Sequence, residues 1–291
     1  MDGFLLIDKA GGMTSHDVVA MARKKLNTKK VGHAGTLDPM ATGVLVLGVG
    51  IATRLLTYIT DGKKSYEGTI LLGSSTHTDD KDGQLTSKAA KEDLAKVTNE
   101  LISDELAKFV GKIKQRPSSV SAIKIDGKSA HARVRAGEQV EIPERDVTID
   151  EILVKEIRVK ESGIEVDISV TCSAGTYIRA IARDLGEQLK VGGHLISLRR
   201  TLVSPFSLKS CQQINDAELI PIVEVIEKLF LVRKLDFSES REILFGRSIV
   251  QNSQPGVVAA LDSQGVFVGL LENKLQGSQI VAAPILVKAS E

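Results

Sequence analysis

The sequence predicts an α+β protein with two domains. The apolar runs Gly3–Ile7 and Val44–Val49 have the length and composition of buried strands. The stretch 18–26 instead places its apolar residues at helical spacing, so strands and helices are mixed along the chain. Beyond about Val232, short apolar runs are separated by glycine turns, which is typical of a small β-rich domain.

The bulk composition fits a globular protein without a membrane anchor. The chain has 291 residues, of which 42% are hydrophobic and 26% charged. It has no signal peptide, and no apolar stretch approaches the roughly 18 residues that a membrane span needs. Two cysteines, Cys172 and Cys211, form neither a disulfide framework nor a CxxC motif. We therefore expect a cytoplasmic protein without membrane contact.

The distribution of charge is more informative than the net charge of +1. Between Gly111 and Arg135 there are seven lysines or arginines and a single acid, Asp126. Acidic residues gather elsewhere, for example at residues 79–82. This segregation favours one basic face, as in proteins that bind nucleic acid, although scattered solvated charge gives the same composition.

The N-terminal third alternates strands and helices. After the strand Gly3–Ile7, Thr14 and Ser15 offer an N-cap for a helix with Asp17 in its first turn. The strand 44–49 is followed by a short helix at 52–59 and by a strand at 65–72.

The rest of the chain follows the same mixture. Residues 91–110 predict two short helices, and residues 149–159 and 163–170 alternate as strands do. A glycine turn after Cys172 leads into a helix. The strands expected near the C-terminus are 257–261, 265–271 and 280–287.

One loop, residues 31–44, combines three glycines, Pro39 and a single carboxylate, Asp38. Pro39 restricts the backbone of Asp38 to extended conformations. Asp38 is also the only acid between Asp17 and Asp61, an interval that holds six lysines or arginines. A nearby cation would lower the pKa of Asp38 and keep it anionic, which suits a nucleophile. The alternative is an ordinary solvated turn.

The string Gly-His-Ala-Gly-Thr-Leu-Asp-Pro-Met-Ala-Thr-Gly-Val-Leu, residues 32–45, resembles the active-site loop of the bacterial TruB family. These tRNA pseudouridine synthases act on the uridine of the T-loop. The segments that resemble further motifs of the family, in the same order, are residues 8–15, 64–68, 111–128, 175–186 and 194–201. The sequence departs from the family pattern at Ala10 and Ser118, where prolines are usual, and at His131, where a tyrosine is usual.

The resemblance implies a mixed, largely antiparallel sheet flanked by helices, with a small PUA-like β domain after it. It places the catalytic domain at residues 1–230, with an RNA-binding segment inserted at about 74–145, and the C-terminal domain at residues 231–291. A stabilising appendage without RNA contact is the alternative for that last part.

The resemblance also assigns roles to matching positions. Asp38 is the essential carboxylate, Arg179 its ionic partner, and Tyr66 the ring that stacks on the uracil of a flipped-out nucleotide. His33 would fill the space that the base leaves, and Lys9 would support the edge of the pocket. Tyr177 and Leu198 would form its walls. Judged singly, Tyr66 could be a packing residue and Arg179 a surface ion-pair partner.

The function implied is isomerisation of the T-loop uridine (U55) of tRNA to pseudouridine. No phosphate-binding loop, zinc spacing or dinucleotide fingerprint is present, so we expect neither cofactor nor metal. The expected partner is the T-arm of tRNA, and we expect a monomer without an obligatory protein partner. The alternatives are a non-catalytic tRNA-binding or RNA-folding protein, a pseudouridine synthase for another RNA, and a hydrolase using Asp38 and His33.

Overall fold

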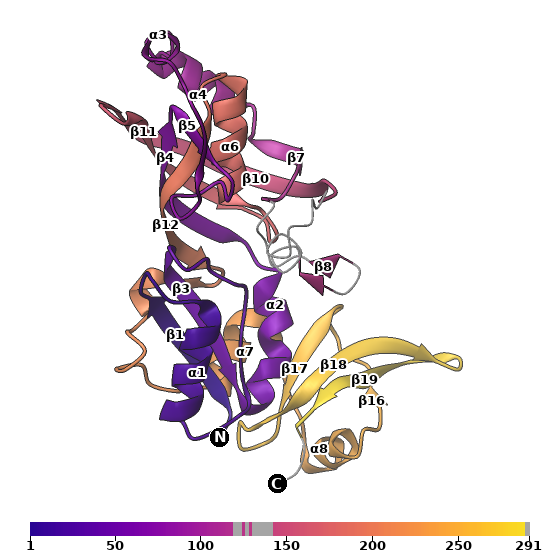
Figure 1. Cartoon of the computed structure of the whole chain (residues 1–291). Coiled ribbons are helices and arrows are strands. Elements are labelled where there is room, and N and C mark those ends of the chain that lie inside the picture. Colours follow the sequence, from indigo (N-terminus) through magenta and orange to yellow (C-terminus); the bar gives the residue numbers. More distant parts are fainter. Residues whose placement is uncertain (119–123, 126–127, 130–141, 289–291) are drawn as a thin grey trace.

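The computed structural model describes residues 1–118, 124–125, 128–129 and 142–288, with backbone alone for the two short middle pieces. The main structural element of the molecule is a ten-stranded sheet (Figure 1). Its main path is β14-β1-β3-β12-β4-β11-β10-β7, with β2 beside β3 and β13 beside β12. The predicted mixed, largely antiparallel sheet flanked by helices is confirmed.

The first helix begins where the sequence predicts. Strand β1 (Gly3–Lys9) leads through a turn to α1 (Ser15–Lys25), and Thr14 forms a capping box with Asp17. Val18, Val19 and Ala22 of α1 face the core. The helix therefore packs by one apolar stripe, and it lies beside the short strand β2 (Val31–His33).

Strand β3 (Thr42–Val49) is apolar and buried from Gly43 to Val49, as expected of a central strand. It pairs antiparallel with both β1 and β2. A 3₁₀ turn, η1 (Gly50–Leu55), and the helix α2 (Leu56–Thr60) follow, at the predicted helix near 52–59. In Figure 1 this group of elements lies below the strands β4, β10 and β11.

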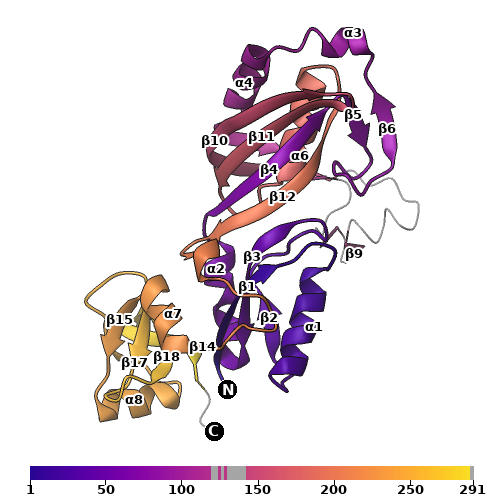
Figure 2. The ribbon, with the colours of Figure 1, turned by 90° about the vertical axis from the view of Figure 1, so that its left-hand side faces the viewer.

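In the other half of the sheet the strands are antiparallel, and buried residues alternate with more exposed ones along them. Strand β11 (Gly163–Cys172) buries every second residue and lies between β4 (Lys64–Leu72) and β10 (Arg145–Lys160). Figure 2 shows the helices on one face of these strands. The elements here are α4 (Asn99–Ala107), α6 (Ile178–Gln188), β7 (Gly111–Gln115), the hairpin β5 (Ser74–Thr76) and β6 (Leu85–Lys88), and the short helix α3 (Lys91–Leu94).

Strand β12 (Gly193–Val203) joins the two halves. It pairs antiparallel with β4, and parallel with β3 at Arg199↔Thr42 and Arg200↔Gly43. Gly43 has φ +100°, and a Cβ there would lie 2.2 Å from the carbonyl oxygen of Arg200. The junction between the halves therefore requires a glycine on β3.

The C-terminal part forms its own five-stranded sheet, in the order β15-β17-β18-β19-β16. This confirms the predicted β-rich C-terminal part, while the boundary at residue 231 stays a prediction. Helix α8 packs against this sheet, and a helix and three short elements connect the sheet to the N-terminal part of the chain. Their bounds are β13 (Phe206–Ser207), η2 (Leu208–Ser210), β14 (Ile220–Pro221), α7 (Ile222–Leu229), β15 (Leu231–Lys234), α8 (Phe237–Leu244), β16 (Ile249–Val250), β17 (Val257–Leu261), β18 (Phe267–Gln276) and β19 (Gln279–Val287).

The C-terminal sheet shares a hydrophobic core with the N-terminal part of the chain. Phe4 and Val46, from β1 and β3, belong to the same buried cluster as Leu261, Phe267 and Leu270 of the C-terminal sheet. The small sheet lies next to α2 and α7 in Figure 1. Burial of this apolar surface stabilises both parts together.

Some elements were not anticipated. The basic stretch at Lys29–Lys30 leads into β2 rather than a plain loop, and residues 193–203 are a strand. Most of the basic segment 111–135, including His131, lies outside the described residues. In the described part of the chain, no helix is long and apolar enough to cross a membrane.

We expect Gly43→Ala to destabilise the fold far more than Gly111→Ala. Both glycines have φ near +100°, but a Cβ at Gly111 meets no described atom within 4 Å. The Gly111 variant should lose about 1 kcal/mol of unfolding free energy, and the Gly43 variant at least about 3 kcal/mol. Urea unfolding measures both. Equal losses would contradict a steric requirement at the β3–β12 junction.

Candidate active site

The loop that carries Asp38 connects β2 to β3. Its ends are fixed because Val31 pairs with Val49 and His33 with Leu47. Gly35 takes φ +88°, and the amide of Ala41 donates to the carbonyl of Asp38 at 3.0 Å. The loop is therefore a compact turn whose carboxylate projects from a restrained backbone.

Side chains from two N-terminal elements form hydrogen bonds with the backbone of this loop. The hydroxyl of Ser15, on α1, accepts from the amide of Leu37 at 2.8 Å and donates to its carbonyl at 3.1 Å. The ammonium group of Lys9, on β1, donates to the carbonyls of Ala10, Met13 and, at 3.4 Å, Pro39. Both side chains are buried, so the backbone on either side of Asp38 is tied to the core.

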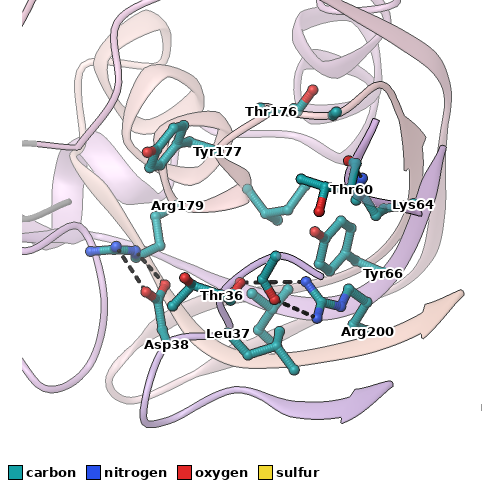
Figure 3. A pocket seen from close by; sticks show the side chains of 15 residues that line it. Thr36, Leu37, Asp38, Thr60, Lys64, Tyr66, Thr176, Tyr177, Arg179 and Arg200 are labelled. Carbon is teal, nitrogen blue, oxygen red and sulfur yellow. Dashed lines mark hydrogen bonds and ion pairs between the residues drawn. The ribbon is translucent and has the colours of Figure 1, made fainter. Parts of the chain in front are cut away.

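Arg200, on β12, holds the same loop from the other side. Its guanidinium donates to the carbonyl of Val44 at 2.8 Å. It also donates to the carbonyls of Gly35 at 3.1 Å and Thr36 at 3.4 Å (Figure 3). The side chain is 1% exposed. Three carbonyl acceptors satisfy a buried cation that would otherwise be costly to desolvate.

Asp38 forms a two-pronged ion pair with Arg179. The Arg179 Nε lies 2.9 Å from Oδ2 of Asp38, and its Nη2 lies 3.2 Å from Oδ1 (Figure 3). Arg179 lies in the first turn of α6, and its Nη1 also contacts the carbonyl of Thr78 at 2.8 Å and Asp80 at 3.3 Å. The side chains of Arg179, Asp80 and Asp38 are 6%, 8% and 33% exposed, so the charge network is buried except at Asp38.

Burial raises the pKa of the Asp38 carboxyl above its ordinary value, Arg179 opposes this, and Asp80 adds to the rise. The sequence-based expectation of a lowered pKa is therefore wrong. The cations that act on Asp38 are Arg179 and Lys9, and their attraction does not outweigh the loss of hydration. Arg179 limits the rise and thus favours the anion.

A cavity of about 270 Å³ opens beside Asp38. Tyr66 of β4, Tyr177 just before α6, and Leu198 of β12 all line it, together with Asp38 and Arg179. Tyr66 and Leu198 are buried, and Figure 3 shows the phenol of Tyr66 next to Arg200. The remaining lining residues are Gly35, Thr36, Leu37, Thr60, Lys64, Ala174, Gly175, Thr176, Ile178 and Arg200.

Burial also changes the protonation of cavity residues. It raises the pKa of the Tyr66 phenol and lowers that of the Lys64 ammonium. Tyr66 therefore stays neutral at physiological pH. The ammonium group of Lys64 is occupied by the carbonyls of Thr60 and Gly62. Among the residues that line the cavity, Asp38 carries the carboxylate, and the neutral ring of Tyr66 lines the same cavity.

Two of the predicted site residues do not line the cavity. His33 packs edge-on against His16, with ring centroids 5.4 Å apart, and burial lowers its pKa. Lys9 lies behind the loop, bonded to backbone carbonyls. The structure thus brings together five of the seven predicted residues, and the roles of all seven stay predictions.

Sequence reasoning missed the residues that position the site. Arg200 lies in the quoted segment 194–201, but its burial was not foreseen, because it depends on the pairing of Arg200 with Gly43 across strands. Asp80 belongs to an acidic loop that looked solvated, and Ser15 was noted only as a possible N-cap. In the described part of the chain, no group of three or more His, Cys, Asp or Glu side chains is arranged to hold a metal ion.

Comparison with known proteins identifies the family. Residues 23–178 match the model of the TruB family pseudouridylate synthase N-terminal domain, and residues 179–230 match the tRNA pseudouridylate synthase B C-terminal domain. The chain belongs to the TruB family. The resemblance noted from its motifs is therefore confirmed.

Relatives support TruB membership along nearly the whole chain. The tRNA pseudouridine synthase B of Corynebacterium diphtheriae is 47% identical, covering 96% of this chain and 94% of that protein. The enzyme of the same name from Leifsonia xyli is 46% identical, covering 93% and 92%.

Solved structures of low identity show the same fold. A chain of an H/ACA RNP bound to a substrate RNA containing 2′-deoxyuridine has a TM-score of 0.70 at 23% identity, covering 98% of this chain and 84% of that one. A chain of a Cbf5-Nop10-Gar1 complex has the same TM-score and coverage at 24% identity.

We expect Arg179→Ala to reduce pseudouridine formation about a hundredfold or more, because Asp38 and Asp80 lose the cation between them. RNA affinity should change far less. Single-turnover assays and filter binding measure the two effects. Arg158→Ala is the control, since Arg158 likewise pairs with carboxylates, three against the two of Arg179, but lies outside the cavity. Near-normal rates for Arg179→Ala would contradict the ion-pair role.

The pH dependence of the reaction should report Asp38. Its folded-state pKa is raised above the ordinary 3.8, so the active anion is lost as pH falls through a value higher than 3.8. The acid limb of kcat/KM should therefore lie above pH 3.8. Asp80→Asn removes a repulsive charge and should move that limb to lower pH. A limb that does not respond to Asp80→Asn would show that another group titrates.

Proposed function

We propose that the protein converts the T-loop uridine of tRNA, U55, to pseudouridine, with Asp38 as the essential carboxylate. Membership of the TruB family confirms the predicted activity class, an isomerase that forms pseudouridine in tRNA. The observation that carries the role of Asp38 is its two-pronged pairing with Arg179 at the wall of a cavity lined by aromatic and apolar side chains.

The reaction rearranges atoms that are already present. The bond between N1 of uracil and the ribose carbon breaks, the base turns, and C5 bonds to the same carbon; C5 then loses its proton and N1 gains one, so the composition does not change. An anionic carboxylate can hold an intermediate covalently or remove a proton, and both steps need Asp38 ionised. Arg179 supplies the opposite charge that keeps it so.

The cavity suits a single base that has left its stack. Its volume of about 270 Å³ lies just below the range of about 300–1,000 Å³ that is usual for pockets of drug-sized ligands. Tyr66 offers a ring for stacking on uracil, while Tyr177 and Leu198 limit access of water. A uridine inside a folded tRNA loop reaches such a cavity only by flipping outward.

The polypeptide acts on tRNA as a monomer in the cytoplasm, and no obligatory protein partner is needed. Size-exclusion chromatography coupled to light scattering, with activity measured across the peak, tests the monomer.

The decisive experiment is to incubate the purified chain with an unmodified tRNA transcript and map pseudouridine. We expect modification at U55 alone, and none in a transcript with cytidine at that position. Asp38→Asn should fold and bind the transcript yet form no product, because an amide cannot act as nucleophile or base. Modification only outside the T-loop would reject the substrate, and product from Asp38→Asn would reject the catalyst.

A further inference from the structure

The carboxamide of Gln115 binds both backbone groups of Tyr177. Its Oε1 accepts from the Tyr177 amide at 2.8 Å, and its Nε2 donates to the Tyr177 carbonyl at 3.0 Å. Gln115 ends β7 and is 1% exposed. A buried amide with two short bonds to one residue behaves like a strand pairing with it, and it restricts the backbone torsions on both sides of that residue.

Tyr177 is the residue at which this restraint has a consequence for the cavity. It immediately precedes α6, has extended backbone angles of φ −101° and ψ 106°, and provides no side-chain cap for the helix. Its ring lines the cavity, and Arg179 follows two residues later in the first turn of α6. Rotation of the Tyr177 backbone would therefore move a wall of the cavity and the start of the helix that presents Arg179.

The end of β7 is itself fixed. Arg183, one turn beyond Arg179 on α6, donates to the carbonyl of Arg116 at 2.8 Å and pairs with Asp79 at 3.2 Å. Gln115 is also paired across strands with Arg145, whose guanidinium lies 6.0 Å from the centroid of the Tyr177 ring. The strand end is thus anchored to α6 and to β10, which makes it a rigid support.

We propose that Gln115 is a positioning residue of this enzyme, which sets Tyr177 in the cavity wall by clamping both of its backbone groups. Gln115 does not line the cavity, so it acts through Tyr177 and not on the substrate. The proposal rests on the function proposed above, since the reaction is one readout of the geometry.

The test uses Gln115→Glu, a substitution whose effect depends on pH. The ionised glutamate still accepts from the Tyr177 amide but repels the Tyr177 carbonyl, whereas the protonated acid can accept and donate as glutamine does. Burial raises the pKa of such a glutamate, so the two forms exchange within an accessible pH range. We expect the kcat ratio of variant to wild type to be reduced about tenfold or more near pH 8 and to approach one near pH 5.5.

Two further variants complete the series. Gln115→Met keeps the size of the side chain without either hydrogen bond, so its kcat ratio should be reduced and independent of pH. Gln188→Glu adds the same charge at the exposed end of α6 and should behave as wild type. If Gln115→Met does not fold, Gln115→Asn, which withdraws the amide by one methylene, takes its place. RNA affinity should change less than kcat throughout.

A second readout does not depend on activity. The chain has three tyrosines, so 3-fluorotyrosine labelling gives three fluorine NMR signals, and Tyr177→Phe identifies that of Tyr177. In Gln115→Glu this signal should move with pH towards its wild-type position as the acid protonates, while those of Tyr58 and Tyr66 stay in place.

The outcomes separate the two proposals. If the wild type forms no pseudouridine but the Tyr177 signal follows the protonation of Glu at 115, the function is wrong and the clamp is right. If Gln115→Glu matches wild type at every pH, the clamp is wrong. It is also wrong if Gln115→Glu and Gln115→Met share a defect that does not vary with pH and leaves the Tyr177 signal unmoved.

Discussion

A buried guanidinium between two carboxylates is the interaction on which the site depends. Arg179 is almost fully removed from water and contacts Asp38 on one side and Asp80 on the other. An unpaired ion in this environment would cost several kcal/mol, so each member of the network constrains the others. The β2–β3 loop, the loop after β5 and the first turn of α6 must all be in place for the network to form.

Asp38 is positioned more by hydrogen bonds to the backbone of its loop than by contacts of its own side chain. Ser15, Lys9 and Arg200 come from three separate elements, and each binds backbone groups of the loop around Asp38. Such a loop has few conformations left to lose when substrate binds. Its carboxylate is therefore preorganised even though the loop has little regular structure of its own.

Regular strands and the main site residues were predictable, while the supporting contacts were not. β1, β3, β4 and β11 show clear apolar runs or alternation in the sequence. Strand β12 does not, because two bulges and two consecutive arginines interrupt its pattern. The carboxylate and its partner Arg179 followed from motifs that resemble a family.

Burial of charged groups explains the remaining differences. The direction of the Asp38 pKa shift depends on how much water the fold removes, and local sequence charge does not report that. In the same way, nothing in the segment 194–201 marks Arg200 as the more buried of its two arginines. Such features depend on which strand lies opposite, and that is decided by contacts distant in sequence.

The parallel pairing of β3 with β12 also has a consequence for the time at which the site forms. Residue 43 meets residue 200, so the loop that carries Asp38 gains the support of Arg200 only after most of the chain has been synthesised. Until then β3 and β4 each have an open edge towards the missing strand β12, and exposed apolar edges promote association between chains. Closing such a long loop slows folding. The pocket should therefore be among the last features to form on a growing chain, and it cannot act on RNA before β12 is in place.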